Sequence, residues 1–392
     1  MKTEQLLFLL LRQELGEIAP IQIDLDKIKE GLDKDQKDQL FNLSKKHDLA
    51  HVIGNALCRL QLISPVDESY KLFEKERLLS VYRSENQLHV YQKIKDAFSK
   101  NSVDFIPLKG LTIHNFYPKD FVRTSCDIDI LVKEEQLEKA QKILAEELGY
   151  IATRGINYRD FAFKAQGNVK VELHFSLKEG VERVDQVLER AWEFATSVNQ
   201  TAEYELTNEF VIFYQLAHSS YHFVGGGCGI KPVIDLFVLE KNLKIDYQML
   251  NELLEKSKLT KFYDVLNNIK DAWLNDKELD KANEKVANFI ISGGAYGSRE
   301  NSILIENVKT GSKIKYFFSR MFLPYRKLKL VYPVLQKHKW LYPFYQVVRW
   351  FSFLFGSRKQ TGRAEIAVLA GANKQELDKA KDLLEQVGLL ES

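Results

Sequence analysis

The stretch that decides the fold runs from Phe105 to Val132, FIPLKGLTIHNFYPKDFVRTSCDIDILV, and ends in an apolar run that contains two aspartates. This run predicts a β-strand, in which residues two apart share a face and lie about 6.6 Å from each other. Asp127 and Asp129 therefore point the same way. At an effective dielectric constant of about 20, two carboxylates at that separation repel each other by about 2.5 kcal/mol. A divalent cation is the obvious compensation.

Strands and helices alternate around the aspartates. Apolar residues three and four apart indicate the helices, and period-two alternation indicates the strands. In order, the pattern predicts a strand over 103–110, a short helix over 111–118, a strand over 126–132, a helix over 133–148 and two strands over 157–165 and 169–177. Because the series ends in a hairpin, it predicts a small β-sheet of mixed direction.

Length and composition set the outer limits. At 392 residues the chain exceeds what one hydrophobic core usually serves, and 45% apolar residues suit an ordered protein. Helical spacing fills the chain on both sides of the predicted sheet. We therefore expect an α+β protein with a helical N-terminal region (1–100), an α/β core (101–198), a helical substrate or acceptor region (199–300), and a basic aromatic C-terminal segment with terminal helices (301–392).

Charge is spread unevenly along the chain. The formal net charge is only +2, yet no Asp or Glu occurs between Asn307 and Ala364, where thirteen Lys or Arg stand. The three cysteines are isolated from one another, which favours a reducing, cytoplasmic setting. The apolar N-terminal run is broken by Arg12 and lacks a small-residue cleavage site, so it predicts an amphipathic helix.

A third carboxylate belongs to the same predicted sheet. The strand VKVELHFSL places Glu172 and His174 on its polar face, opposite an apolar face that includes Val171 and Leu173. Three carboxylates on neighbouring strands can hold two Mg²⁺ ions, which prefer oxygen ligands and also bind phosphates. Two such ions can stabilise the attacking and leaving oxygens of a phosphoryl displacement.

With these residues in view, the sequence resembles a known family. The segments LKG, YPKDFVRTSCDIDILV and VELHFSL are similar to those of the uncharacterised bacterial nucleotidyltransferase family of the DNA polymerase β-like superfamily. The resemblance implies a nucleotidyltransferase fold. It also implies transfer of a nucleoside monophosphate from an NTP to an unknown acceptor, with release of pyrophosphate. Asp127, Asp129 and Glu172 would be both catalytic residues and ligands of two Mg²⁺ ions, with Mn²⁺ as a substitute.

The resemblance also indicates a nucleotide-binding set. Lys109 and Gly110 stand where the wider superfamily has a Gly-Gly or Gly-Ser turn that receives phosphates, so the lysine is a departure from that pattern. Arg123 precedes the aspartates by four residues and suits pairing with a phosphate or a carboxylate. Ser125 completes the predicted nucleotide-binding set.

Five further polar residues are candidates for the acceptor site or its pocket: His174, His218, His222, Lys231 and Asp235. His174 could act directly, orient a ligand by hydrogen bonding, or line the wall. His218 and His222 have the four-residue spacing of a shared metal on a helix, although a pocket-lining role is the stronger expectation. Lys231 and Asp235 have the spacing of an ordinary salt bridge, which competes with a nucleotide contact.

The basic segment at residues 309–363 is rich in aromatic residues and leaves three interpretations open. It could lie on an anionic membrane, bind RNA through phosphates and stacking, or pack against the acidic body. Its apolar run over 341–355 is too short for a transmembrane span. We expect a cytoplasmic enzyme, at most peripheral at the inner membrane surface. The alternatives are a non-catalytic nucleotide-binding or scaffold protein, and a peripheral membrane protein that acts through this segment.

Overall fold

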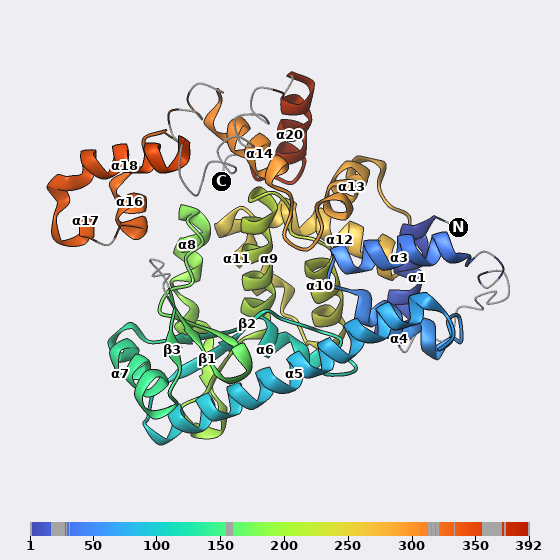
Figure 1. Cartoon of the computed structure of the whole chain (residues 1–392), viewed down its shortest axis with the longest axis horizontal. Coiled ribbons are helices and arrows are strands. Elements are labelled where there is room, and N and C mark those ends of the chain that lie inside the picture. The colour runs from blue at the N-terminus through green and yellow to red at the C-terminus, as the bar shows by residue number, and fades with distance from the viewer. Residues whose placement is uncertain are drawn as a thin grey trace.

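The structure is a computed structural model that describes residues 2–16, 32–153, 160–312, 321–332, 334–354 and 374–390, with single positions at 28, 30, 315, 318 and 371. The expected α+β class is confirmed: a small mixed sheet is surrounded by helices (Figure 1). The longer helices are α1 (Thr3–Leu15), α3 (Lys34–Lys46), α4 (Ala50–Arg59), α5 (Glu68–Lys100), α8 (Glu182–Leu188), α9 (Asn208–Val224), α10 (Lys231–Asn242), α11 (Tyr247–Ser257), α12 (Thr260–Leu274), α13 (Glu284–Gly293), α14 (Arg299–Thr310), α16 (Tyr325–Val331), α18 (Tyr342–Leu354) and α20 (Lys374–Gln386).

The main sheet has the order β1-β2-β5-β4-β3. Its strands are β1 (Phe105–Leu108), β2 (Asp127–Val132), β3 (Ile151–Ala152), β4 (Asp160–Lys164) and β5 (Lys170–His174). β2 runs antiparallel to β1 and parallel to β5, and β4 runs antiparallel to both of its neighbours. The predicted strands are therefore present in the expected mixed sheet, while residues 157–159 of one of them lie outside the described residues. A separate pair joins β6 (Ala195–Ser197) to β7 (Tyr204–Leu206).

Short helices connect the strands as the spacing predicts. After β1 the chain forms α6 (Gly110–Ile113) and one 3-10 turn that ends before Pro118. After β2 it forms α7 (Leu137–Lys142), which continues as a π-helical turn over Ile143–Glu147. Pro107 lies in β1 at the end of the sheet order. An edge strand tolerates proline because one side of it needs no backbone donor.

The apolar face of the sheet is covered by the C-terminal half of α5. Ile128, Ile130 and Val171 are fully buried in one hydrophobic cluster with Ile94 and Phe98 of this helix. A one-residue slip of β2 would move its isoleucines to the carboxylate face and put its aspartates among the apolar side chains of this cluster. The apolar face therefore sets the direction in which the acidic residues point.

The opposite face of the sheet lies against the helical body. Ile106, Leu108 and Leu131 belong to a larger cluster that also contains Phe210 and Phe213 of α9. The same cluster includes the core side chains of α1, α3, α4 and α10–α13, so the N-terminal helices and those that follow the sheet share one core. α5 spans both clusters, since Phe73 in its first half packs with the helical body. No helix in the described ranges is both long and apolar enough to cross a bilayer.

Candidate active site

The three predicted carboxylates lie on one face of the sheet. In the parallel pair of β2 and β5, Asp129 is opposite Glu172 and Asp127 is opposite Lys170. Residues that are opposite in a sheet point to the same side, and alternation brings His174 to that side as well. This is the face toward α9, because Leu131 on the same side of β2 packs in one cluster with Phe210 and Phe213 of that helix.

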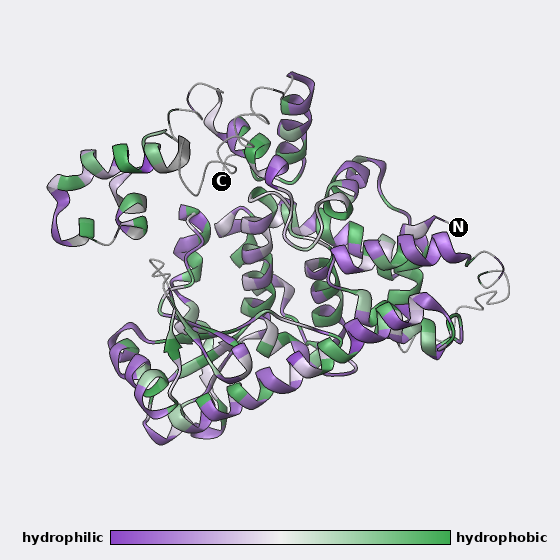
Figure 2. Ribbon diagram, in the orientation of Figure 1, coloured by the Kyte–Doolittle hydropathy of each residue, from purple (hydrophilic) through white to green (hydrophobic). Residues whose placement is uncertain are grey.

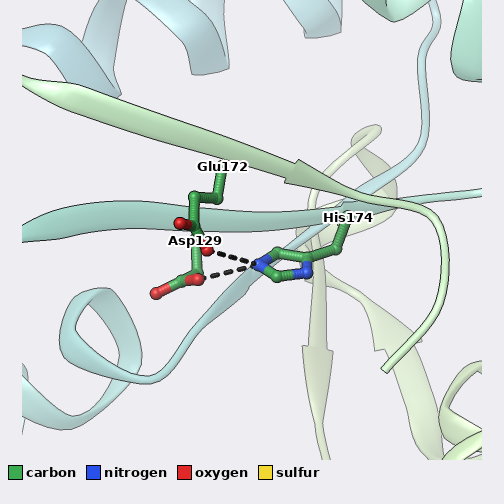
Figure 3. Close-up of side chains that lie close together, drawn as sticks. All are labelled: Asp129, Glu172 and His174. Carbon is green, nitrogen blue, oxygen red and sulfur yellow. Dashed lines mark hydrogen bonds and ion pairs between the residues drawn. The ribbon is translucent and has the colours of Figure 1, made fainter. Parts of the chain in front are cut away.

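Asp129 is the centre of the site. Its side chain is 2% exposed, and its Oδ1 accepts hydrogen bonds from Lys109 Nζ at 3.0 Å and from His174 Nε2 at 2.7 Å. Burial alone would raise the pKa of Asp129, but Lys109 and His174 hold it well below its usual range. Glu172 Oε2 lies 3.6 Å from His174 Nε2. Ligand atoms of Asp129, Glu172 and His174 lie within 4.8 Å of one another and could hold a metal ion (Figure 3).

The hydrogen bond to Asp129 determines the tautomer of His174. A carboxylate offers no proton, so Nε2 must carry the hydrogen. Nδ1 is buried and has no hydrogen-bond partner in the part of the chain that the structure describes. Of the roles expected for His174, the structure shows the orienting hydrogen bond to an acidic residue.

Asp127, predicted as a third carboxylate ligand, lies on the same face but is not part of this group of three side chains, and its side chain is more exposed, at 28%. Ser125 Oγ lies 3.3 Å from its Oδ1, and Lys170 Nζ lies 3.7 Å from its Oδ2. Burial, together with the charges of Asp129 and Glu172, raises the pKa of Asp127 to about 6. Lys170 also forms an ion pair with Glu172. Three carboxylates therefore share the site with two lysines, Lys109 and Lys170.

The turn between β1 and α6 supplies the buried cation. Lys109 has a φ of 48°, which is uncommon for a residue with a side chain. Burial alone would lower the pKa of Lys109, but Asp129 raises it above its ordinary value, so the side chain stays charged. A Cβ on Gly110 would lie 2.8 Å from Ser125 Cβ. Glycine is therefore required for the turn to approach the segment that leads into β2.

A cleft of about 560 Å³ opens at Ser125 and Cys126, the two residues before Asp127. It is lined by Lys45, Lys46, Asp48, Leu79, Tyr82, Arg83, Asn86, Gln87, Ser125, Cys126, Gly167, Asn168, Val169, Ala295 and Tyr296. Three basic residues and one acidic residue give it an excess of positive charge. Tyr296 extends over it from a tight turn: Gly297 has a φ of 70°, and a Cβ there would lie 2.4 Å from Gly226 C. The volume is that of a small-molecule site.

Arg123 and Asp235 are paired with each other, and Arg123 also reaches the turn of the site, since its Nη1 would lie 3.6 Å from a Cβ on Gly110. Arg123 Nε and Nη2 donate to the two oxygens of Asp235, each at 2.9 Å, and Asp235 is fully buried. Tyr117 Oη and Gln215 Nε2 also donate to that carboxylate, at 2.7 and 2.9 Å. The pair thus ties the segment before β2 to α9 and α10. The nucleotide and acceptor roles expected for these two residues stay predictions.

Lys231 and the two histidines of α9 also have defined partners. Lys231 forms an ion pair with Asp48 and donates to Thr124 Oγ1 at 2.9 Å, so it does not form the i,i+4 pair with Asp235 that its spacing allowed. His218 Nδ1 lies 2.8 Å from Glu179 Oε1, and its Nε2 lies 3.0 Å from His222 Nε2. Burial and the charge of Lys109 lower the pKa of His218 to about 4. Within the described ranges these histidines belong to no group of three metal-binding side chains.

Two neighbours of the site, Lys170 and Tyr296, were not among the site residues predicted from the sequence. Lys170 was one of several polar residues on its strand, and its position opposite Asp127 depends on the register of β2 and β5. Tyr296 Oη lies 2.9 Å from Cys126 Sγ although the two residues are far apart in the chain. Alternation puts Lys170 on the polar face of its strand together with Glu172, without assigning it a role, but nothing local to residue 296 indicates a site.

The fold and the site together define a metal-compatible acidic centre on a small mixed sheet, as in enzymes of phosphate chemistry. The sequence matches a family model described as uncharacterised nucleotidyltransferase over residues 33–275, more than half of the chain. The chain belongs to this nucleotidyltransferase family. No curated protein matches the sequence.

The charge balance of Asp127 leads to a stability prediction. Its folded pKa of about 6 lies above the ordinary 3.8, so between these values the folded protein binds more protons than the unfolded chain. In metal-free buffer this residue therefore lowers the free energy of unfolding as the pH rises toward 6. Asp127→Asn should remove that dependence and stabilise the protein at pH 7 by about 1–2 kcal/mol. Urea unfolding at several pH values in the presence of a chelator measures it. A destabilised variant at pH 7 would contradict the proposed charge imbalance.

Proposed function

We propose that this protein is a divalent-metal-dependent nucleotidyltransferase with a polymerase β-like core, which moves a nucleoside monophosphate from an NTP to an acceptor. In the reaction an acceptor oxygen forms a bond to the α-phosphorus, the bond to the β-phosphate oxygen breaks, and pyrophosphate leaves. The acceptor proton passes to a carboxylate of the site or to water. The observation that carries the proposal is the placement of Asp127, Asp129 and Glu172 on one face beside the Lys109–Gly110 turn.

The side chains of the site suit a divalent cation. Asp127, Asp129 and Glu172 supply oxygen donors for Mg²⁺, and Mn²⁺ accepts the same carboxylate ligands. The raised pKa of Asp127 also supports a cation site, because the neighbouring carboxylates repel each other and a bound cation would relieve that repulsion. One or two ions held here would neutralise the triphosphate and acidify an acceptor hydroxyl.

The residues of the turn and of the loop before β2 would position the donor. Lys109 is the buried cation nearest to Asp129, and its ammonium could interact with phosphate oxygens as well as with this carboxylate. The missing side chain at Gly110 leaves backbone accessible beside Ser125. The hydrogen bond from His174 holds the carboxylate of Asp129 in one orientation. A fixed orientation of catalytic groups lowers the entropic part of the barrier to phosphoryl transfer.

The positively charged cleft is the proposed place of the second substrate. It begins at Ser125 and Cys126, directly before Asp127, so a ligand bound in it would have one end at the carboxylates. Tyr82 and Tyr296 are 59% and 73% exposed and could stack against a ring. Arg83, Lys45 and Lys46 favour an acceptor that carries negative charge. His218, His222, Lys231 and Asp235 would support this region from the helical body.

Incubation with each NTP labelled at the α-phosphate tests the reaction class. With Mg²⁺ and a panel of acceptors (phosphorylated sugars, tRNA, proteins and lipid-linked glycans), we expect the α-label to enter one acceptor and pyrophosphate to appear in equal amount. The γ-label should appear in pyrophosphate and not in the acceptor, because the bond that breaks lies between the α- and β-phosphates. Glu172→Gln should reduce the transfer by at least about a hundredfold, as expected for a lost contribution of several kcal/mol to the transition state.

Two outcomes would contradict this proposal. Entry of the γ-label into the acceptor would identify a kinase-like reaction on the same side chains. Mg²⁺-dependent NTP binding in calorimetry, without transfer to any acceptor, would favour the non-catalytic nucleotide-binding alternative. The ion pairs of Lys170 with Asp127 and Glu172 are the observation that favours that alternative, since a lysine there partly replaces a metal ion.

A further inference from the structure

The chain forms a small helical hairpin after α14, which we call the aromatic arm: residues 321–332 and 334–354, containing α16, α17 (Val334–Lys337) and α18. In Figure 1 it projects to one side, separated from the sheet and from α9–α12. The arm has an interior of its own. Leu328 and Leu335 are fully buried, and the ring of Tyr332 lies 4.7 Å from that of Tyr345. It is therefore a folded unit and not a loose tail.

The polar side chains of α18 point into the arm. Gln346 and Arg349 are 4% and 7% exposed. Gln346 Nε2 donates to Leu323 O at 2.6 Å, and Arg349 Nη1 donates to Met321 O at 3.2 Å. These bonds satisfy carbonyl groups of the segment that precedes α16. They also remove the only basic side chain of α18 from its outer surface.

The apolar side chains of the same helix point to solvent. Phe344, Val347 and Phe351 are 60%, 42% and 62% exposed, and Trp340, in the 3-10 turn that leads into the helix, is 76% exposed. Their spacing of four, three and four residues places them along one stripe. In Figure 2 the ribbon of this hairpin carries hydrophobic stretches interrupted by hydrophilic ones. A stripe of large apolar side chains of this kind marks an interaction surface.

Charge decides what covers the stripe. The chain from Asn307 to Ala364 has thirteen basic residues and no acidic one. Lys337 and Lys339 are exposed directly beside Trp340. A second copy of the arm would bring the same positive charge against it, which opposes self-association. RNA binding through phosphates needs basic side chains along the contact, but the arginine of α18 is buried.

We infer that the aromatic arm binds the surface of an anionic lipid bilayer. The stripe of Trp340, Phe344, Val347 and Phe351 enters the boundary between headgroups and acyl chains, as amphipathic interfacial helices do. Lys337 and Lys339 lie at the level of the acidic headgroups. Binding at the interface is consistent with the absence of a membrane-spanning helix in the described residues. This inference is independent of the proposed reaction, because it involves none of the residues of the carboxylate site.

Vesicle flotation of the full-length protein tests the inference. The wild type should float with vesicles of phosphatidylcholine and phosphatidylglycerol and stay behind with phosphatidylcholine alone. Phe344→Ser combined with Phe351→Ser should weaken binding by about a hundredfold, at about tenfold for each aromatic side chain removed from the lipid. Lys337→Glu with Lys339→Glu should weaken binding to the anionic vesicles by at least about tenfold.

Brominated acyl chains should quench tryptophan fluorescence in the wild type, and less so in Trp340→Phe.

A matched control replaces two exposed apolar side chains of the body. Val66→Ser with Leu72→Ser, at positions 92% and 43% exposed, should float like the wild type. Thermal unfolding of every variant shows whether it is folded, and because the altered side chains of the arm are exposed, little change is expected. The inference is overturned if the wild type fails to float, if neutral vesicles bind equally well, or if the Phe344/Phe351 variant floats unchanged. It is also overturned if the Phe344/Phe351 variant still floats but has lost self-association in ultracentrifugation, or still floats but no longer retains RNA.

Discussion

Asp129→Asn is expected to abolish nucleotidyl transfer. The aspartate accepts hydrogen bonds from Lys109 and His174 and belongs to the group of side chains that could hold a metal. Asparagine keeps the shape of the side chain but removes its charge. A metal contributes several kcal/mol of charge stabilisation in the transition state, so transfer of the α-label should fall by at least about a thousandfold. The rate of label transfer under saturating NTP and metal measures it.

Asp104→Asn is the matched control for this variant. Asp104 lies just before β1 and pairs with Lys133 at 2.6 Å near the surface. Exposed pairs contribute at most about 1 kcal/mol to stability, so this variant should keep both its fold and its transfer rate. If Asp129→Asn transfers label as fast as Asp104→Asn does, Asp129 has no part in catalysis, and the proposed function loses its central residue.

The largest effect on stability is expected for Asp235→Ala. This carboxylate is fully buried and accepts four hydrogen bonds, two of them from Arg123. Its removal leaves a guanidinium buried without a counter-charge, which typically costs about 3–5 kcal/mol. The free energy of unfolding from urea titrations should fall by this amount. Because Arg123 lies in the segment that leads into β2, NTP binding should weaken in the same variant.

A double variant separates an unpaired charge from a general packing defect. Combining Asp235→Ala with Arg123→Met removes both charges, so the cost should be clearly smaller than that of Asp235→Ala alone. Asp264→Ala, at an exposed position of α12, is the control and should leave stability within about 0.5 kcal/mol of the wild type. The loss of unfolding free energy in the double variant is compared with the losses in Asp235→Ala and Arg123→Met alone. If it equals their sum, the two charges do not stabilise each other and the prediction is wrong.

The local architecture around the aspartates could be predicted because it depends on short-range pattern. The alternation of Ile128 and Ile130 with the two aspartates indicates a strand, and the structure has it over Asp127–Val132, although both of its faces are buried beyond Asp127. The same alternation put Glu172 and His174 on one side of β5. Adjacent strands in one sheet then bring those sides together, provided that the register is right.

The surroundings of the site could not be predicted in the same way. The partners of Arg123 and Lys231 lie more than a hundred residues away in the chain, and the spacing of Lys231 and Asp235 indicated a different pair. The cleft combines segments from Lys45 to Tyr296. Such contacts depend on how whole helices pack, which a local pattern does not specify. The orientation of α18 is a further example, since composition alone left open which side its aromatic residues would face.

The sequence by itself determined the type of each element near the site, the polar face of the strands, and the three acidic residues that this face presents. Side-chain direction in a strand follows from backbone geometry, so it needs no knowledge of distant contacts. Only the tertiary structure decided which cations balance those acids, which polar residues are used in packing, and where the cleft opens. These features depend on burial and on charges that come from remote parts of the chain, and electrostatic effects inside a protein change with every such neighbour.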